Sequence, residues 1–275
     1  MSLPFLELLV VLTAAPLPGP LRVCADPANL PFSNRRRDGF ENRIAEVLAR
    51  ELGTVPEYTW WPGRRGFLKN TLLAHRCDVV IGMPVGTEQV RTLAPYYTST
   101  YVFVTREGRH AVRSFDDPAL ARLKIGVPVI GDDYANPPPL QALARRGITR
   151  NVTGVPVYVA AGEPSPAERL TRAVARGEVD VAILWGPSAG WYASRASPQV
   201  TVTPVSPAVD RGLPFTFAIA LAVRPGDAEL ASRLDAALSR RASEVREILE
   251  SYAVPLVGTP LATTPCDSEA PCGAR

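Results

Sequence analysis

The chain has 275 residues, of which 46% are hydrophobic and 21% charged, and its net charge is +3. This length and hydrophobic content can support two domains, each with its own core. The basic residues are scattered along the chain, which argues against a nucleic-acid-binding surface.

Residues 1–20 contain the apolar run Leu8–Ala15 followed by a proline-rich break, the pattern of a signal-peptide core. Glu7 precedes the run and a positively charged start is absent, so a misassigned start of translation is an alternative. No stretch reaches the roughly 20 apolar residues that a membrane span needs. We expect a signal peptide or its remnant over residues 1–20 and no membrane span.

From Leu21 the chain alternates between strand-like and helix-like patterns. The first buried strand ends in a polar, proline-containing loop at Asp26–Asn34. Apolar residues recur at helical spacing from Gly39 to Leu52, where Gly53 ends the helix. The unit continues with a strand over 56–61, a helix over 67–73, a strand over 77–83 and a long strand over 96–105. This order predicts a parallel sheet with right-handed crossovers.

A second unit with the same alternation follows. Its predicted strands are 123–129, 152–158, 179–185, 200–205 and 215–223, and its helices are 139–146, 166–176 and 188–194. Two closing helices, around Leu230–Leu238 and Val245–Tyr252, need a sheet to cover, and the first unit lacks that cover. The chain is therefore expected to cross between the units near residue 101 and to return near residue 219.

The predicted fold class is α/β, with two discontinuous lobes joined by two crossing strands. Lobe 1 would contain residues 21–101 and 219–258, lobe 2 residues 102–218, and residues 259–275 an irregular tail. Hinge-closing binding proteins have this plan and hold their ligand between the lobes. The architecture favours a binding protein over an enzyme.

The four cysteines indicate the redox compartment. Cys24 and Cys77 fall on strands that should be neighbours in a sheet of order 2-1-3, while Cys266 and Cys272 lie in the tail. This arrangement predicts two disulfides in an oxidising compartment. The alternative is that Cys24 and Cys77 are buried free thiols. A metal site is not expected, because no CxxC pair exists and His75 and His110 are the only histidines.

The segments from about residue 21 to 256 resemble the type II periplasmic solute-binding proteins. They are most similar to the quinoprotein-dehydrogenase-associated binding proteins of the MxaJ/XoxJ type, in the blocks Val23–Asn34, Gly39–Asn42, Tyr58–Pro62, Arg65–Phe67, Asn70–Leu72, Arg76–Gly82 and Ile183–Pro187. The resemblance implies a non-enzymatic periplasmic protein without a cofactor. Its implied partner is a PQQ-dependent methanol dehydrogenase, with the c-type cytochrome of that enzyme as a second candidate.

The residues differ from those of amino-acid carriers of the same fold. Such carriers use an S-x-T-x-x-R loop to bind the ligand carboxylate and an acidic residue in lobe 2 to bind its amino group. Here the loop runs from Met83 to a displaced Arg91, and Trp185 stands where the acid is expected. The chain is therefore predicted to bind amino acids poorly.

The predicted cleft residues follow the ends of the strands, where open α/β sheets bind ligands. They are Asp26, Asn29, Leu30 and Phe32, then Trp61, Arg65, Met83 and Pro84, and from lobe 2 Asp132, Asp133, Tyr134, Trp185 and Trp191. Asp26 is the leading polar candidate, with a turn-capping role as its alternative. The aromatic residues would bind an aromatic ligand or a partner's loop, or else serve lobe packing.

Two further motifs indicate possible chemistry. Arg64 and Arg65 would bind an anion or form a solvated surface pair. Gly186–Gly190 matches G-x-S-x-G, but no histidine follows Ser188, so hydrolysis is disfavoured and the serine is expected to cap a helix. The leading hypothesis is thus an accessory protein for maturation, activation or docking of the dehydrogenase. The rival is a substrate-binding receptor of an ABC transporter.

Overall fold

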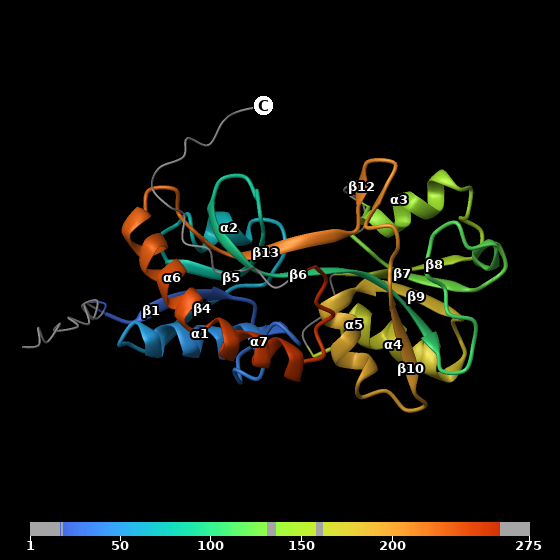
Figure 1. The fold of residues 1–275 in the computed structure, drawn as a ribbon, viewed down its shortest axis with the longest axis horizontal. Helices are drawn as coiled ribbons and strands as arrows, with labels where there is room; N and C mark the ends of the chain where they lie inside the picture. Colours follow the sequence, from blue (N-terminus) through green and yellow to red (C-terminus); the bar gives the residue numbers. More distant parts are fainter. Residues whose placement is uncertain (1–16, 18, 131–135, 158–161, 259–275) are drawn as a thin grey trace, which may run out of the picture.

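Two α/β lobes lie side by side in the computed structural model, which describes residues 17, 19–130, 136–157 and 162–258 (Figure 1). Two long strands, β6 (Arg91–Arg106) and β13 (Thr216–Val223), run between the lobes. The predicted α/β class with two crossing strands is confirmed.

The first lobe is built on a parallel sheet in the predicted order. β1 (Leu21–Ala25) pairs with β4 (Pro56–Trp60) on one side and with β5 (Val79–Pro84) on the other. Helices α1 (Phe40–Glu51), α6 (Ala228–Arg240) and α7 (Ala242–Ser251) bury their apolar faces in one core with this sheet. Helices α6 and α7 therefore cover the sheet of the first lobe, as expected from their apolar faces. A small hairpin, β2 (Ala28–Asn29) and β3 (Ser33–Asn34), follows β1.

The second lobe has strands in the order β8-β7-β9-β6-β10. Its elements are η1 (Pro118–Ala121), β7 (Ile125–Val129), α3 (Pro138–Arg145), β8 (Val152–Pro156), α4 (Pro166–Arg176), β9 (Val181–Trp185), α5 (Gly186–Ala193), β10 (Val200–Pro204), β11 (Val209–Asp210) and β12 (Leu213–Pro214). The bounds of α4 match the prediction because Ser165 accepts a hydrogen bond from the Glu168 amide at one end and Gly177, at φ 75°, ends the helix at the other.

The crossing strands share one hydrogen-bonded register at the lobe junction. Thr216 of β13 lies opposite Thr100 of β6, and the Tyr101 amide donates to the Phe215 carbonyl at 2.9 Å. Further along, β6 pairs with β9 and β10. β6 begins five residues before the predicted Tyr96, since the register shift around Ala220 accommodates Pro95 within the strand.

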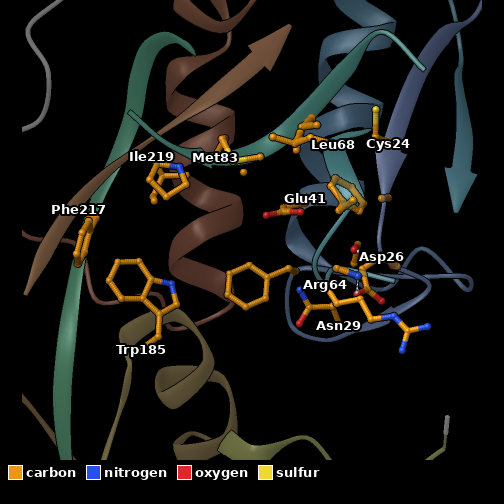
Figure 2. Close-up of a pocket in the computed structure, with 18 of the residues that line it drawn as sticks. Cys24, Asp26, Asn29, Glu41, Arg64, Leu68, Met83, Trp185, Phe217 and Ile219 are labelled. Carbon is orange, nitrogen blue, oxygen red and sulfur yellow. Dashed lines mark hydrogen bonds between the residues drawn. The ribbon is translucent and has the colours of Figure 1, made fainter. Parts of the chain in front are cut away.

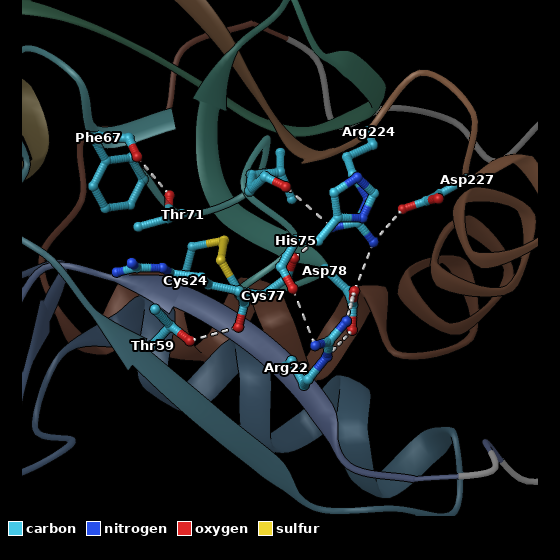
Figure 3. Close-up of a disulfide and its surroundings, with 12 residues drawn as sticks. Arg22, Cys24, Thr59, Phe67, Thr71, His75, Cys77, Asp78, Arg224 and Asp227 are labelled. Carbon is cyan, nitrogen blue, oxygen red and sulfur yellow. Dashed lines mark hydrogen bonds and ion pairs between the residues drawn. A yellow bond between two sulfur atoms is a disulfide. The ribbon is translucent and has the colours of Figure 1, made fainter. Parts of the chain in front are cut away.

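Cys24 and Cys77 form the predicted disulfide between β1 and the segment before β5 (Figure 3). Next to it, Arg22 and Arg224 both pair with Asp78 at 2.6 Å. Burial would raise the pKa of Asp78, but hydrogen bonds from the two arginines outweigh it and hold that pKa below its ordinary value. The predicted second pair, Cys266 and Cys272, lies outside the described residues, as does the predicted tail.

The helix predicted over 67–73 is one turn long, α2 (Phe67–Asn70). The hydroxyl of Thr71 donates to the Phe67 carbonyl at 2.6 Å, and the backbone of Thr71 leaves the helical region. The chain then turns through His75, which has a positive φ of 57°, and reaches Cys77. The apolar residues at helical spacing are therefore buried by turns and by the disulfide.

Candidate functional site

A pocket of about 880 Å³ lies at the lobe junction (Figure 2). Its walls come from the end of β1 and the loop after it, the first turn of α1, residues 63–69, β5, both crossing strands and the end of β9. The carboxyl ends of β1 and β5 open into it, as expected for an α/β sheet. Most of the lining belongs to the first lobe.

Three aromatic rings form a corner of the pocket, which we call the aromatic corner: Tyr101 of β6, Trp185 of β9 and Phe217 of β13. Their ring centroids lie 5.4 to 6.4 Å apart and each pair meets at a steep angle. These separations and angles are those of favourable edge-to-face contacts. The corner holds its shape because the crossing strands and β9 are hydrogen-bonded neighbours.

Asp26 lines the pocket and also organises its floor. Its Oδ1 accepts from the Ala28 amide at 2.7 Å, which is the Asx turn considered as an alternative. Its Oδ2 accepts from the Gly63 amide at 2.5 Å and so joins the loop after β1 to the loop after β4. The Asp26 carboxyl therefore both lines the pocket and caps the turn after β1.

Glu41, in the first turn of α1, was not among the predicted site residues. Its carboxyl points into the cavity (Figure 2), and no hydrogen bond or ion pair joins it to another described residue. Burial, and to a smaller extent the charge of Asp26, raises the pKa of Glu41 to about 8. Gly82 of β5 makes room for it, because a Cβ there would lie 2.0 Å from a Glu41 oxygen.

Seven of the predicted cleft residues line this pocket: Asp26, Asn29, Phe32, Arg65, Met83, Pro84 and Trp185. Asp132, Asp133 and Tyr134 lie outside the described residues. Residues that sequence analysis missed include Glu41, Phe67, Leu68, Lys69, Tyr97, Tyr101, Phe217 and Ile219. The sequence could have indicated Tyr101, Phe217 and Ile219 as pocket residues, because the crossings between the lobes were predicted near residues 101 and 219.

Leu30, Trp61 and Trp191 do not line this pocket. Trp61 follows the edge strand β4, and the Arg76 guanidinium carbon lies over the Trp61 ring, 5.8 Å from the ring centre. Trp191 projects from α5 and stacks on Tyr252 with ring centroids 4.7 Å apart. Leu30 accepts a hydrogen bond at its carbonyl from the Tyr192 hydroxyl. Their positions at the ends of strands and on a helix did not determine the direction of their side chains.

Arg91 lies away from the pocket. It begins β6 opposite Val223, and its charge acts on Asp235 of α6. Among the described residues that line the pocket, Trp185 holds the lobe-two position where carriers have an acid. In the described pocket, neither Arg91 nor an acid at position 185 therefore contributes to an ion-pairing clamp for a free amino acid.

The G-x-S-x-G segment forms α5. The N-cap of this helix is Trp185, so the prediction that Ser188 caps it was wrong; Pro187, which lacks an amide hydrogen, fits the first turn and sets the start earlier. His110 lies 2.6 Å from Asp117 in the second lobe. In the part of the chain that the structure describes, no cluster of His, Cys, Asp or Glu could hold a metal ion, and no helix is long and apolar enough to cross a bilayer.

Two α/β lobes, two crossing strands and a pocket at their junction define a solute-binding protein of the periplasmic type. The chain is 32% identical over 261 residues to protein MoxJ of Methylorubrum extorquens, a match that covers 89% of this chain and 84% of that protein. The chain belongs to the MoxJ family, whose members include the MxaJ and XoxJ types of solute-binding protein.

Solved structures agree with this assignment. The periplasmic binding protein XoxJ from Methylobacterium extorquens AM1 is 32% identical, with a TM-score of 0.71 over 87% of this chain and all of that one. MxaJ from Methlophaga aminisulfidivorans MPT is 25% identical, with a TM-score of 0.74 over 86% of this chain and all of that one. No protein-family profile matches the sequence.

Proposed function

We propose that this chain is a non-enzymatic accessory protein of the periplasm that binds a PQQ-dependent methanol or alcohol dehydrogenase and assists its maturation, activation or docking. Membership of the MoxJ family supports the partner. The disulfide between Cys24 and Cys77 supports an oxidising compartment.

The observation that carries the proposal is the aromatic corner, in which Trp185 stands at the position where a carrier is expected to have an acid. Trp185, Tyr101 and Phe217 offer flat apolar surface to an inserted side chain or loop. Tryptophan and tyrosine are enriched among the few residues that dominate the binding energy of protein interfaces. Met83, an adaptable side chain, lines the same pocket.

Capture of the dehydrogenase by the immobilised protein tests the proposal. The apo and PQQ-loaded forms of a PQQ-dependent methanol dehydrogenase from the same organism serve as prey, and the c-type cytochrome of that enzyme is tried separately. Trp185→Ala is expected to weaken capture at least tenfold, because about 2 kcal/mol is the usual contribution of an interface hot spot. Trp60→Ala is the matched control, since Trp60 stacks on Tyr58 at the sheet edge and does not line the pocket. Failure to capture either form would overturn the proposal.

The second candidate function is a receptor that delivers a small solute to an ABC permease. The volume of about 880 Å³ is compatible with this function, because it is enough for a small organic molecule. A solute that raises the melting temperature in proportion to its concentration would support this function. A screen of quinones and small acids that produces no shift would count against it.

A further inference from the structure

The Glu41 carboxyl faces the pocket without the donors that usually stabilise a carboxylate at the start of a helix. The amides of Phe40 and Glu41 donate to the carbonyls of Pro31 and Phe32, at 2.8 and 2.9 Å. These two amides at the start of α1, which would favour a negative charge, are thus already satisfied by the loop. The loop sits this close because residue 39 is glycine, where a Cβ would lie 2.1 Å from the Phe32 carbonyl oxygen.

The surroundings of this carboxyl are mainly apolar. Figure 2 shows Trp185, Phe217 and Ile219 lining one side of the cavity into which Glu41 points. Aromatic faces carry partial negative charge, so the corner attracts cations and offers little to anions. A negative carboxyl beside such a corner is the combination that recognises alkylammonium groups.

The other charged groups around the pocket do not neutralise Glu41. Asp26 carries the same charge as ionised Glu41, and this charge raises the pKa of Glu41 further. Arg64, Arg65 and Lys69 are exposed, and the Arg64 guanidinium points away from Glu41 in Figure 2. The tyrosines of β6 near this carboxyl are Tyr96, Tyr97 and Tyr101. Burial raises the pKa of Tyr96 and Tyr97 well above the ordinary value and that of Tyr101 to about 12, so all three stay neutral.

We propose that this pocket binds a small organic cation, an ammonium group on an apolar body, with the Glu41 carboxylate as counter-ion and the aromatic corner around the alkyl groups. A bound cation would supply the missing partner of Glu41, and its apolar part would cover Trp185 and Phe217. An anion would meet Glu41 and Asp26 together. The inference does not depend on the dehydrogenase as partner.

Binding of the cation is coupled to loss of a proton. In the free protein the pKa of Glu41 is about 8, so the carboxyl is mostly protonated at neutral pH and must ionise when the cation enters. Affinity for a permanently charged cation therefore rises by about tenfold from pH 7 to pH 9, since the ionised fraction rises by that factor. A neutral ligand that accepts a hydrogen bond from the protonated acid would show the opposite pH dependence.

Titration calorimetry with benzyltrimethylammonium tests the proposal, because this probe cannot itself lose a proton. We expect saturable binding to one site at pH 8.5. At pH 7, where the free carboxyl is mostly protonated, we expect proton release that appears as a dependence of the enthalpy on the buffer. Glu41→Gln should weaken binding at least tenfold. Glu46→Gln is the control, since Glu46 lies on the same helix but does not line the pocket, and it should bind the probe as the wild type does.

Benzyl alcohol, a neutral aromatic of similar size, should bind at least tenfold more weakly than the probe. The proposal is overturned if the probe does not bind, if Glu41→Gln binds it unchanged, or if benzyl alcohol binds as tightly. Circular dichroism of the Glu41→Gln protein shows whether it is folded, and Phe217→Leu, which alters the corner and keeps the carboxyl, should weaken the probe about threefold. Capture of the dehydrogenase is measured separately, so failure of one proposal leaves the other standing.

Discussion

Among single residues, Glu41 has an energetic effect that can be measured without any ligand. The folded chain keeps a proton on this carboxyl up to about pH 8, whereas the unfolded chain releases it near the ordinary value of 4.5. Between these values the folded state binds more protons than the unfolded state, so the free energy of unfolding falls as pH rises. Above about pH 8 the whole penalty of a buried charge is present.

We therefore expect Glu41→Gln to be as stable as the wild type at pH 4 and more stable at pH 8.5. The difference should be about 2 kcal/mol, which allows for water in the open pocket. Urea unfolding at a series of pH values measures it. Curves for wild type and variant that stay parallel from pH 5 to 8.5 would contradict a pKa of about 8 for Glu41.

The cysteine pair is the second residue-scale feature. Cys24 and Cys77 are 53 residues apart in sequence, and closing a loop of that length restricts the unfolded chain. Replacing both by alanine should lower the free energy of unfolding by about 4 kcal/mol. Guanidinium unfolding of the double variant against the oxidised wild type measures the loss. A change below about 1 kcal/mol would mean that the unfolded chain is held together by other contacts.

At the scale of elements, periodicity predicted most helices and strands, because apolar residues alternate or recur where one face is buried. It failed at residues 71–73, where turns and the disulfide bury leucines at helical spacing. It also could not assign Glu41, because nothing local distinguishes a pocket-facing acid in a first helical turn from a solvated one. The side on which Trp61 and Trp191 lie depends on tertiary partners, Arg76 and Tyr252.

Helix α5 packs closely against the chain that follows α7. A Cβ on Gly190 would lie 1.8 Å from the Ala253 carbonyl oxygen, so backbone meets backbone there. Gly190→Ala should therefore destabilise the protein by about 2 kcal/mol, although alanine is the better helix former. Thermal unfolding measures this. Gly226→Ala is the control, because a Cβ at Gly226 would meet nothing within 4 Å, and equal melting temperatures for the two variants would refute the contact.

For the whole molecule, residues 252–257 act as a third connection between the lobes, beside the two crossing strands. Tyr252 stacks on Trp191, whose other neighbour is the Arg195 guanidinium at 3.3 Å from its ring centre. The Ser99 hydroxyl donates to the Pro255 carbonyl at 2.6 Å, and the Val257 amide donates to the Thr98 carbonyl at 3.0 Å. These contacts join the end of the first lobe to α5 and to β6 near the junction. We call this third connection, residues 252–257, the strap. Lobes joined by two strands and the strap have less freedom to rotate against each other than lobes joined by two strands alone.

We expect this strap to suppress the closing motion that hinge-type carriers make around their ligands. The radius of gyration of the wild type, measured by small-angle X-ray scattering, should be the same with and without saturating benzyltrimethylammonium. Replacing both Trp191 and Tyr252 by alanine removes the stacked pair, worth about 1 kcal/mol, and should make the radius of gyration larger or dependent on the cation. Trp60→Ala leaves the strap intact and is the control. A wild-type protein that contracts on binding would show that the lobes close despite the strap, and the carrier function would then be favoured over the accessory one.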